Sequence, residues 1–226
     1  LQDLQIDAAA SFVGANRVVF SQNGDQFACL RDGSLQVCAT DEPGHPLFSE
    51  PDFSEEAMID AMGAGWAAWR PTAGTLFFKN GLNGKKWENT VQSNPDEFLP
   101  VAFDETGSRV AFCPSPDSVE VRSLENGALI AARNFNGAVL QLRFVPYSGE
   151  LAVIQQIASG LYDEDQTVAK IWNPVLPQQK PRPVRLQGYT IRWSDLAPGG
   201  DQIAFSSGHD VRIFRLDNLL DETARI

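Results

Sequence analysis

The 226-residue sequence is poor in the residue types on which most catalytic and metal sites depend. It contains two histidines, three cysteines and two methionines. Gly-x-Ser-x-Gly, His-Glu-x-x-His and Cys-x-x-Cys motifs are absent, as is any apolar run of the roughly 20 residues that span a bilayer. We therefore expect no catalytic centre of these types, no metal, no cofactor and no membrane-embedded segment.

Two short matches to catalytic motifs do not meet the requirements of the chemistry. Residues 84–86 read Gly-Lys-Lys, but Lys86 stands where a phosphate-binding loop needs Ser or Thr. His209 follows Ser207 closely and precedes Asp210, but adjacent residues of one strand turn do not by themselves form a catalytic triad. We interpret both segments as hairpin turns.

Positive charge is also scarce. The chain has 18 Lys and Arg residues against 29 Asp and Glu residues, for a net charge of −11 and a pI of about 4.6. Binding to nucleic acid needs a surplus of cations to neutralise phosphates, so nucleic acid is not expected as a primary ligand. The acidity instead favours a protein partner with a basic surface.

The cysteines are few and odd in number, which argues against a disulfide framework. Cys29 and Cys38 flank the turn at Asp32-Gly33, and a two-residue hairpin there would pair Cys29 with Gln36. The two sulfurs would then be diagonal neighbours, too far apart for an easy bridge. We expect buried free thiols and a reducing, cytoplasmic compartment.

An internal repeat is the strongest signal in the sequence. Five segments consist of a short apolar strand that ends in an aromatic residue, a polar turn with glycine, and a second apolar strand. The aromatic residues fall 49, 34, 41 and 49 positions apart, which averages about 43, as in blades of four strands. They are Phe20, Trp69, Phe103, Phe144 and Trp193, and the turn glycines are Gly24, Gly74, Gly107, Gly149 and Gly200.

Further strands follow these hairpins. Alternating apolar patterns predict third strands and two fourth strands, and apolar residues occur at both parities. Both faces of each sheet should therefore be buried in an all-β, antiparallel fold. The third strands are expected at residues 34–38, 118–122, 166–172 and 210–214, and the fourth strands at 128–134 and 183–186.

The segments at residues 23–37 and 117–127 resemble the repeat of the WD-repeat family. The resemblance covers roughly residues 15–216 and implies a β-propeller of about five four-stranded antiparallel blades in one domain, residues 1–216. It implies blades at roughly 9–48, 58–92, 98–135, 137–187 and 188–216, with residues 1–8 as a closing outer strand. Residues 217–226 would form a short helix or tail, and the alternative is that the chain is part of a larger propeller.

The chain departs from the family where a Trp-Asp pair usually ends the third strand. Only Trp172-Asn173 comes close to that pair. Three irregular segments interrupt the repeat. Residues 50–62 carry apolar side chains at helical spacing and predict a short helix or a partner-binding insertion. Residues 173–185 hold four prolines and predict an extended connection or docking segment, and residues 161–165 predict an acidic hairpin tip.

The resemblance implies a non-catalytic module for protein–protein recognition or scaffolding, whose partners include other parts of its own parent protein. Two alternatives remain. One is the sensory C-terminal propeller of a larger signalling NTPase or protease, because the chain begins at Leu1 rather than Met. The other is a glycosidase-like enzyme with carboxylates about 5–10 Å apart among Asp25, Asp104 and Asp195. The candidate partner-binding residues are Trp66, Trp69, Arg70, Asp104, Tyr189 and Asp195.

Overall fold

A computed structural model describes most of the repeat region. The described residues are 18–20, 24–42, 44–51, 59–62, 65–70, 75–80, 86–90, 100–145, 147–157, 166–184, 193–196, 202–207 and 210–215. Within these ranges, the side chains at 59–62, 65–70 and 193–196 are among those that lie outside the description. In this part of the chain, no helix is long and apolar enough to cross a membrane.

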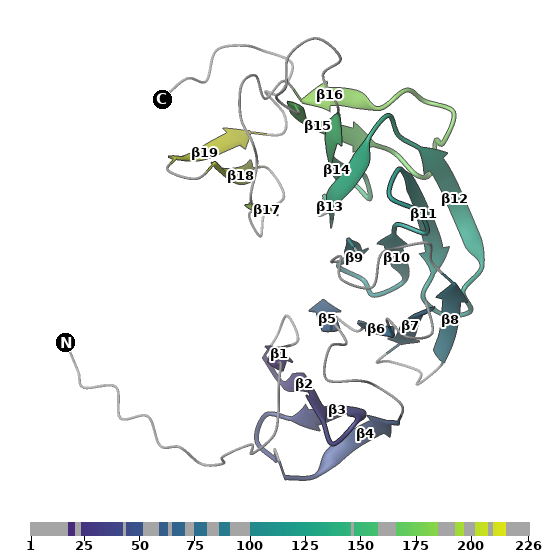
Figure 1. Ribbon diagram of the computed structural model, residues 1–226, viewed down its shortest axis with the longest axis vertical. Helices are drawn as coiled ribbons and strands as arrows, with labels where there is room; N and C mark the ends of the chain where they lie inside the picture. The colour runs from purple at the N-terminus through teal and green to yellow at the C-terminus, as the bar shows by residue number, and fades with distance from the viewer. Residues whose placement is uncertain are drawn as a thin grey trace, which may run out of the picture.

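The described residues form five antiparallel sheets that follow one another in chain order (Figure 1). Each sheet is a simple meander in which sequential strands are neighbours, so the predicted all-β, antiparallel class is confirmed. The first sheet contains β1 (Val18–Phe20), β2 (Gln26–Arg31), β3 (Ser34–Ala39) and β4 (Pro46–Glu50). The second contains β5 (Ile59–Met62), β6 (Gly65–Arg70), β7 (Thr75–Asn80) and β8 (Lys86–Thr90). The third contains β9 (Val101–Phe103), β10 (Arg109–Phe112), β11 (Ser118–Ser123) and β12 (Leu129–Asn134). The fourth contains β13 (Ala138–Phe144), β14 (Leu151–Ile157), β15 (Gln166–Trp172) and β16 (Arg182–Val184), and the fifth contains β17 (Trp193–Leu196), β18 (Gln202–Ser207) and β19 (Asp210–Arg215).

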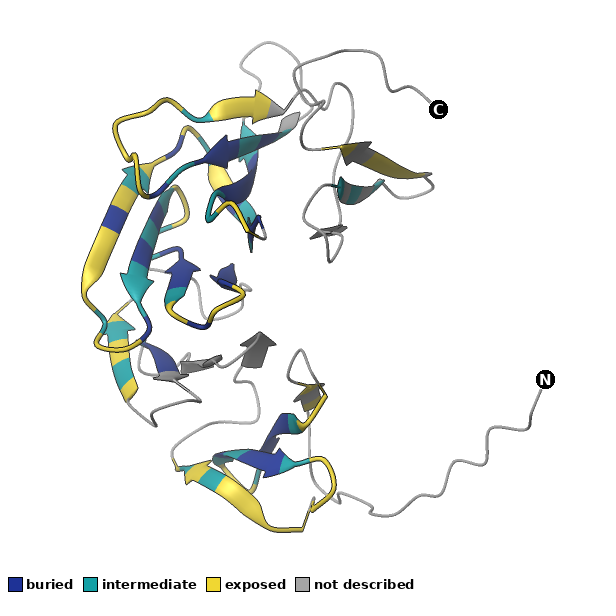
Figure 2. Ribbon diagram, turned by 180° about the vertical axis from the view of Figure 1, so that it is seen from behind, coloured by how far each residue is buried: buried dark blue, intermediate teal, exposed yellow. Residues whose placement is uncertain are grey.

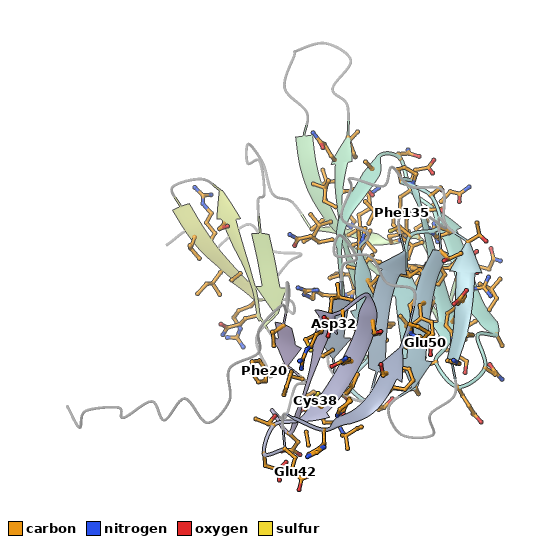
Figure 3. All side chains as sticks on the ribbon, turned by 60° about the horizontal axis from the view of Figure 1, so that its bottom comes forward. Phe20, Asp32, Cys38, Glu42, Glu50 and Phe135 are labelled. Carbon is orange, nitrogen blue, oxygen red and sulfur yellow. The ribbon has the colours of Figure 1, made fainter. Side chains whose placement is uncertain are left out.

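The first strands of consecutive sheets line the inside of an arc. β1 contacts β5, β5 contacts β9, β9 contacts β13, and β13 contacts β17. Figure 1 shows this arc open between the first and the fifth sheet. Phe20 of β1 is 56% exposed and lies on the side of its sheet that faces the fifth sheet (Figure 3). Within the described residues the sheets therefore do not close into a ring.

The third sheet shows why apolar residues occur at both parities of a strand. Val110 and Phe112 of β10 pack in one cluster with Leu76 and Phe78 of the second sheet. Ala111, between them, belongs to a different cluster that includes residues of the fourth sheet. Successive side chains of a strand point to opposite faces, so the third sheet is buried on both sides. The prediction of two buried faces is confirmed for this sheet.

The repeat was assigned one strand out of phase in the second segment. The hairpin that ends in Trp69 was expected to supply the first and second strands, but β6 and β7 are the second and third strands of their sheet. The first strand is β5, which ends at Met62. First strands then end 42, 41 and 41 residues apart, at Phe20, Met62, Phe103 and Phe144. The irregular intervals of 49 and 34 came from comparing different hairpins of one meander.

The predicted pairing around the cysteines is confirmed. Cys29 pairs with Gln36, and Phe27 pairs with Cys38. Asp32 and Gly33 form the connecting turn with φ of 51° and 71°, as a two-residue hairpin requires. All three cysteines are free and buried. Of the five repeat-turn glycines, Gly24, Gly107 and Gly149 have positive φ as predicted, and the other two lie outside the described residues.

Two of the irregular segments differ from prediction. The helix expected at residues 50–62 is wrong over Ile59–Met62, which pair with β6 as a strand because cross-strand pairing overrides the helical spacing. The extended segment expected at 173–185 is wrong over 173–180. There, Leu176 N–H donates to the Asn173 carbonyl and Gln179 N–H to the Leu176 carbonyl, which makes successive tight turns. The expected closing strand at 1–8, the acidic tip at 161–165 and the tail at 217–226 lie outside the described residues.

Candidate functional site

Two turns that occupy the same position in adjacent sheets form the best-defined surface feature. One joins β9 to β10 through residues 104–108, and the other joins β13 to β14 through residues 145–150. Because β9 and β13 lie in contact, the two turns are neighbours although about 40 residues separate them in sequence. Their side chains interlock through Asp104, Glu105 and Arg109.

Asp104 organises the first turn. Its side chain is 4% exposed, and its Oδ1 accepts the backbone N–H groups of Ser108 at 2.8 Å and Arg109 at 2.9 Å. Its Oδ2 contacts the Ser108 hydroxyl at 2.8 Å and the Thr106 hydroxyl at 2.9 Å, and accepts from Arg109 Nε at 3.0 Å. A buried carboxylate is tolerated only when hydrogen bonds replace water, and here both oxygens are used inside the turn.

The same contacts fix the protonation state of Asp104. Burial alone would raise the pKa of this carboxyl, but the hydrogen bonds from Arg109, Ser108 and Thr106 outweigh it and lower the pKa below 3.8. Asp104 is therefore ionised at neutral pH. The general acid of a glycosidase pair needs a raised pKa, so this environment does not favour that role for Asp104.

Arg109 links the first turn to the second. Its Nη1 lies 3.5 Å from the Gly149 carbonyl, and its guanidinium carbon lies 5.2 Å from the centre of the Phe144 ring. Gly149 has a φ of +67°, and a Cβ there would lie 2.9 Å from Arg109 Nη2. Glycine is thus required both by the backbone and by the close approach of the arginine.

Tyr147 projects from the second turn. It is 82% exposed, with a φ of +61° that costs a non-glycine residue on the order of 1–2 kcal/mol. Its backbone N–H donates to Glu105 Oε1 of the first turn at 3.2 Å. The exposed ring is therefore held in a strained conformation by a contact from the neighbouring sheet. Such strain persists where the surroundings enforce it, and it is common at functional sites.

The second turn is also fixed from its own sheet. Val145 N–H donates to the Glu150 carbonyl at 2.8 Å, and Ser148 Oγ donates to the Val145 carbonyl at 3.1 Å. Arg182 of β16 donates to both carboxylate oxygens of Glu150, at 2.9 and 2.7 Å. Tyr147 is thus an aromatic side chain presented to solvent on a rigid support, beside the exposed carboxylate of Glu105.

This pair offers recognition chemistry rather than bond-making chemistry. A tyrosine face attracts a Lys or Arg side chain, and a neighbouring carboxylate adds an ion pair. Tyrosine is also enriched among residues that dominate protein interfaces. Among the described residues no group of three or more His, Cys, Asp or Glu side chains is placed to hold a metal ion.

The predicted site residues do not come together in the described structure. Trp66, Trp69 and Arg70 lie on β6 and Asp195 lies on β17, but their side chains are outside the description, as is all of Tyr189. For Asp104 the structure supports an internal role, since the carboxylate is buried within its own turn. The contribution of the other five residues to partner binding stays a prediction.

Sequence reasoning did not single out Tyr147, Glu105 or Arg109. The available signal was an aromatic residue in the centre of a polar turn, followed by Ser148 and Gly149. Turn positions of this kind are usually filled by small or polar residues, so a tyrosine there is informative.

Comparisons with known proteins bear on the fold alone. No protein-family model and no curated protein matches the chain. Among 1076 solved chains that match is one from Kuenenia stuttgartiensis hydrazine synthase. It has a TM-score of 0.65 and 12% sequence identity, and the match covers 93% of this chain and 67% of that chain. Architectures shared so widely host many functions, so the similarity does not indicate an activity.

Proposed function

We propose that the chain is a non-catalytic β-propeller of the WD-repeat type that serves as a protein–protein recognition or scaffolding module. Five meander sheets in chain order, adjoining first strands and intervals of 41–42 residues support the propeller architecture. In this proposal the open arc is completed to a ring, and the partner binds at the turns that join first to second strands.

The observation that carries the recognition role is Tyr147. Its ring is 82% exposed on a turn that contacts from two sheets hold in a strained conformation. A preorganised aromatic side chain loses little conformational entropy on binding, which favours its use as an anchor. The net charge of −11 and the adjacent Glu105 carboxylate favour a partner that presents Lys or Arg to this surface.

The proposal is tested by site-specific photo-crosslinking. A photoreactive phenylalanine analogue replaces Tyr147 in one sample, and Leu47 of β4, 61% exposed, in a matched control. A protein that crosslinks from position 147 but not from position 47 is then purified with the unmodified chain. We expect Tyr147→Ser to weaken that complex by about 30-fold, the effect of an interface hot spot, and rising salt to weaken it further.

Two results would contradict the proposal. One is an identical set of crosslinked proteins from both positions, and the other is a complex that Tyr147→Ser binds as tightly as the unmodified chain. The Leu47→Ser variant is the control in the binding assay, because it removes an exposed apolar side chain from a different element. It should bind the partner with unchanged affinity.

A further inference from the structure

Most of the described cations with a printed ionic contact lie beside a carboxylate. Arg109 contacts Asp104, Lys86 contacts Glu50, and Arg182 contacts Glu150. Arg133 of β12 and Lys170 of β15 differ, because they lie close to each other and, among the described residues, neither makes an ion pair. In a chain with eleven more acidic than basic residues, two adjacent cations without a carboxylate are unexpected.

Arg133 is fixed in orientation without being neutralised. Its Nη1 donates to the carbonyls of Pro177 at 2.9 Å and Gln179 at 3.0 Å, in the loop between β15 and β16. These bonds use both hydrogens of Nη1. The Nε and Nη2 hydrogens, which form one edge of the guanidinium, have no partner within the described structure. That edge carries the parallel donors that bind carboxylate or phosphate in a bidentate manner.

Lys170 supplies the second positive charge. It is half-buried on β15, its cross-strand partners are Val153 and Pro183, and its Nζ lies 5.9 Å from the centre of the Phe135 ring. Phe135 lies among the strands of the third and fourth sheets (Figure 3). Burial lowers the pKa of Lys170, and the nearby charge of Arg133 lowers it further. The fold thus holds two like charges together where water screens them incompletely, which is unfavourable until an anion binds.

The loop that anchors Arg133 also exposes apolar side chains. Val175 and Leu176 are 67% and 56% exposed. The loop is ordered by Asn173, whose Oδ1 accepts the Val175 N–H at 3.0 Å and whose carbonyl accepts the Leu176 N–H at 3.2 Å. It passes the C-terminal end of β12 (Figure 1) and is exposed along its length (Figure 2). An anionic group bound at Arg133 would bring flanking apolar residues of the same ligand within reach of this loop.

We propose that Arg133 and Lys170 form a binding site for an oxyanion, a carboxylate or a phosphate group, carried by an apolar peptide segment of a protein partner. Arg133 binds the group through its Nε and Nη2 edge, Lys170 adds a point charge, and Val175 and Leu176 contact the flanking residues. A single anionic group on a peptide is favoured over a nucleic acid or an anionic membrane, because the net charge of −11 repels an extended polyanion. This surface is distinct from the Tyr147 turn, so the two proposals stand or fall separately.

Three short peptides test the proposal on the full 226-residue chain. They share the form acetyl-Leu-X-Leu-amide, with phosphoserine, glutamate or serine at X, and binding is followed by calorimetry and by the NMR signal of the Arg133 Nε–H. We expect an anionic peptide to bind at least about tenfold more tightly than the serine peptide, as a charge-assisted hydrogen bond provides. Binding of the phosphoserine peptide alone identifies a phosphate source, and binding of both anionic peptides identifies a carboxylate site.

Variants assign the binding to the two cations. Lys170→Gln should reduce the affinity for the anionic peptides by about fivefold or more, and Lys170→Arg should retain it. Lys180→Gln is the matched control, because it removes an exposed cation of the same loop that has no contact with Arg133 in the described structure. Equal binding of all three peptides, or equal binding by Lys170→Gln and the unmodified chain, would overturn the site. Tighter binding of an oligothymidylate than of any peptide would overturn the assignment to a protein partner.

Discussion

Replacing Asp104 by Asn tests whether this carboxylate holds the first turn together. The substitution keeps the size of the side chain and leaves one oxygen to accept the N–H groups of Ser108 and Arg109. It places an amide NH2 where Oδ2 now accepts from Arg109 Nε at 3.0 Å. Two donors would then face each other, and the guanidinium would lose its anionic partner.

The expected loss follows from the burial of the two groups. A hydrogen bond to a charged group contributes about 1.5–3 kcal/mol, and a buried partner left unpaired adds to the cost. Arg109 is 21% exposed, so water recovers part of its solvation. We therefore expect Asp104→Asn to lower the free energy of unfolding by about 2 kcal/mol, which is about 1 M in the urea midpoint for an m-value near 2 kcal/mol/M.

The effect should depend on pH with a defined sign. The folded-state pKa of Asp104 is lowered, so its stabilisation is fully present above the unfolded pKa of about 3.9 and is lost as pH falls through the folded pKa. The difference between the two proteins should be constant from pH 7 to about 5 and should narrow below about 4. Asp117→Asn is the control, because Asp117 is exposed and should change stability by about 0.5 kcal/mol or less. Equal midpoints at pH 7, or a difference that stays constant down to pH 3, would refute the reasoning.

Two further predictions concern the packing of the sheets. Gly137→Ala should lower the free energy of unfolding by about 3 kcal/mol or more, because Gly137 has a φ of +133° and a Cβ there would overlap the Gln156 carbonyl oxygen. Gly44→Ala, with nothing within 4 Å of the added Cβ, should change thermal unfolding little, and equal effects of the two would contradict this account. Burial raises the pKa of every thiol, so a disulfide reagent at pH 8 should label none of them in the native chain and all of them in urea; rapid native labelling of any one would contradict the burial of Cys29, Cys38 and Cys113.

The strands were predictable wherever local sequence determines the pairing. The two-residue turn at Asp32-Gly33 leaves one register for its flanking strands, and that register is observed. The third strand of the fourth sheet was expected at Gln166–Trp172 and has the same bounds in the structure. In both segments a turn or an alternation of five or more residues specifies the structure without help from the rest of the chain.

Sequence reasoning failed where the decisive contact is non-local. Every hairpin of a meander consists of strand, turn and strand, so the pattern ending at Trp69 could not reveal that β6 is a second strand. The spacing of residues 59–62 fits a helix as an isolated segment, but pairing with β6 makes them a strand. An interval of 34 beside one of 49 was the signal of a wrong phase, because stacked repeats of one design should have similar lengths.

The candidate sites depend on non-local contacts to a greater degree. The strained backbone of Tyr147 is held by Glu105, 42 residues earlier, and Arg133 is oriented by carbonyls 44 and 46 residues later. Net charge correctly counts the acidic surplus, but it cannot distinguish Asp104, which is enclosed by its own turn, from Glu105, which is exposed beside an aromatic ring. Nor can it reveal that two of the few cations lie together without a carboxylate. Propeller-like sheets place turns from distant repeats side by side, so each such surface combines residues whose relation becomes visible only after the sheets have packed.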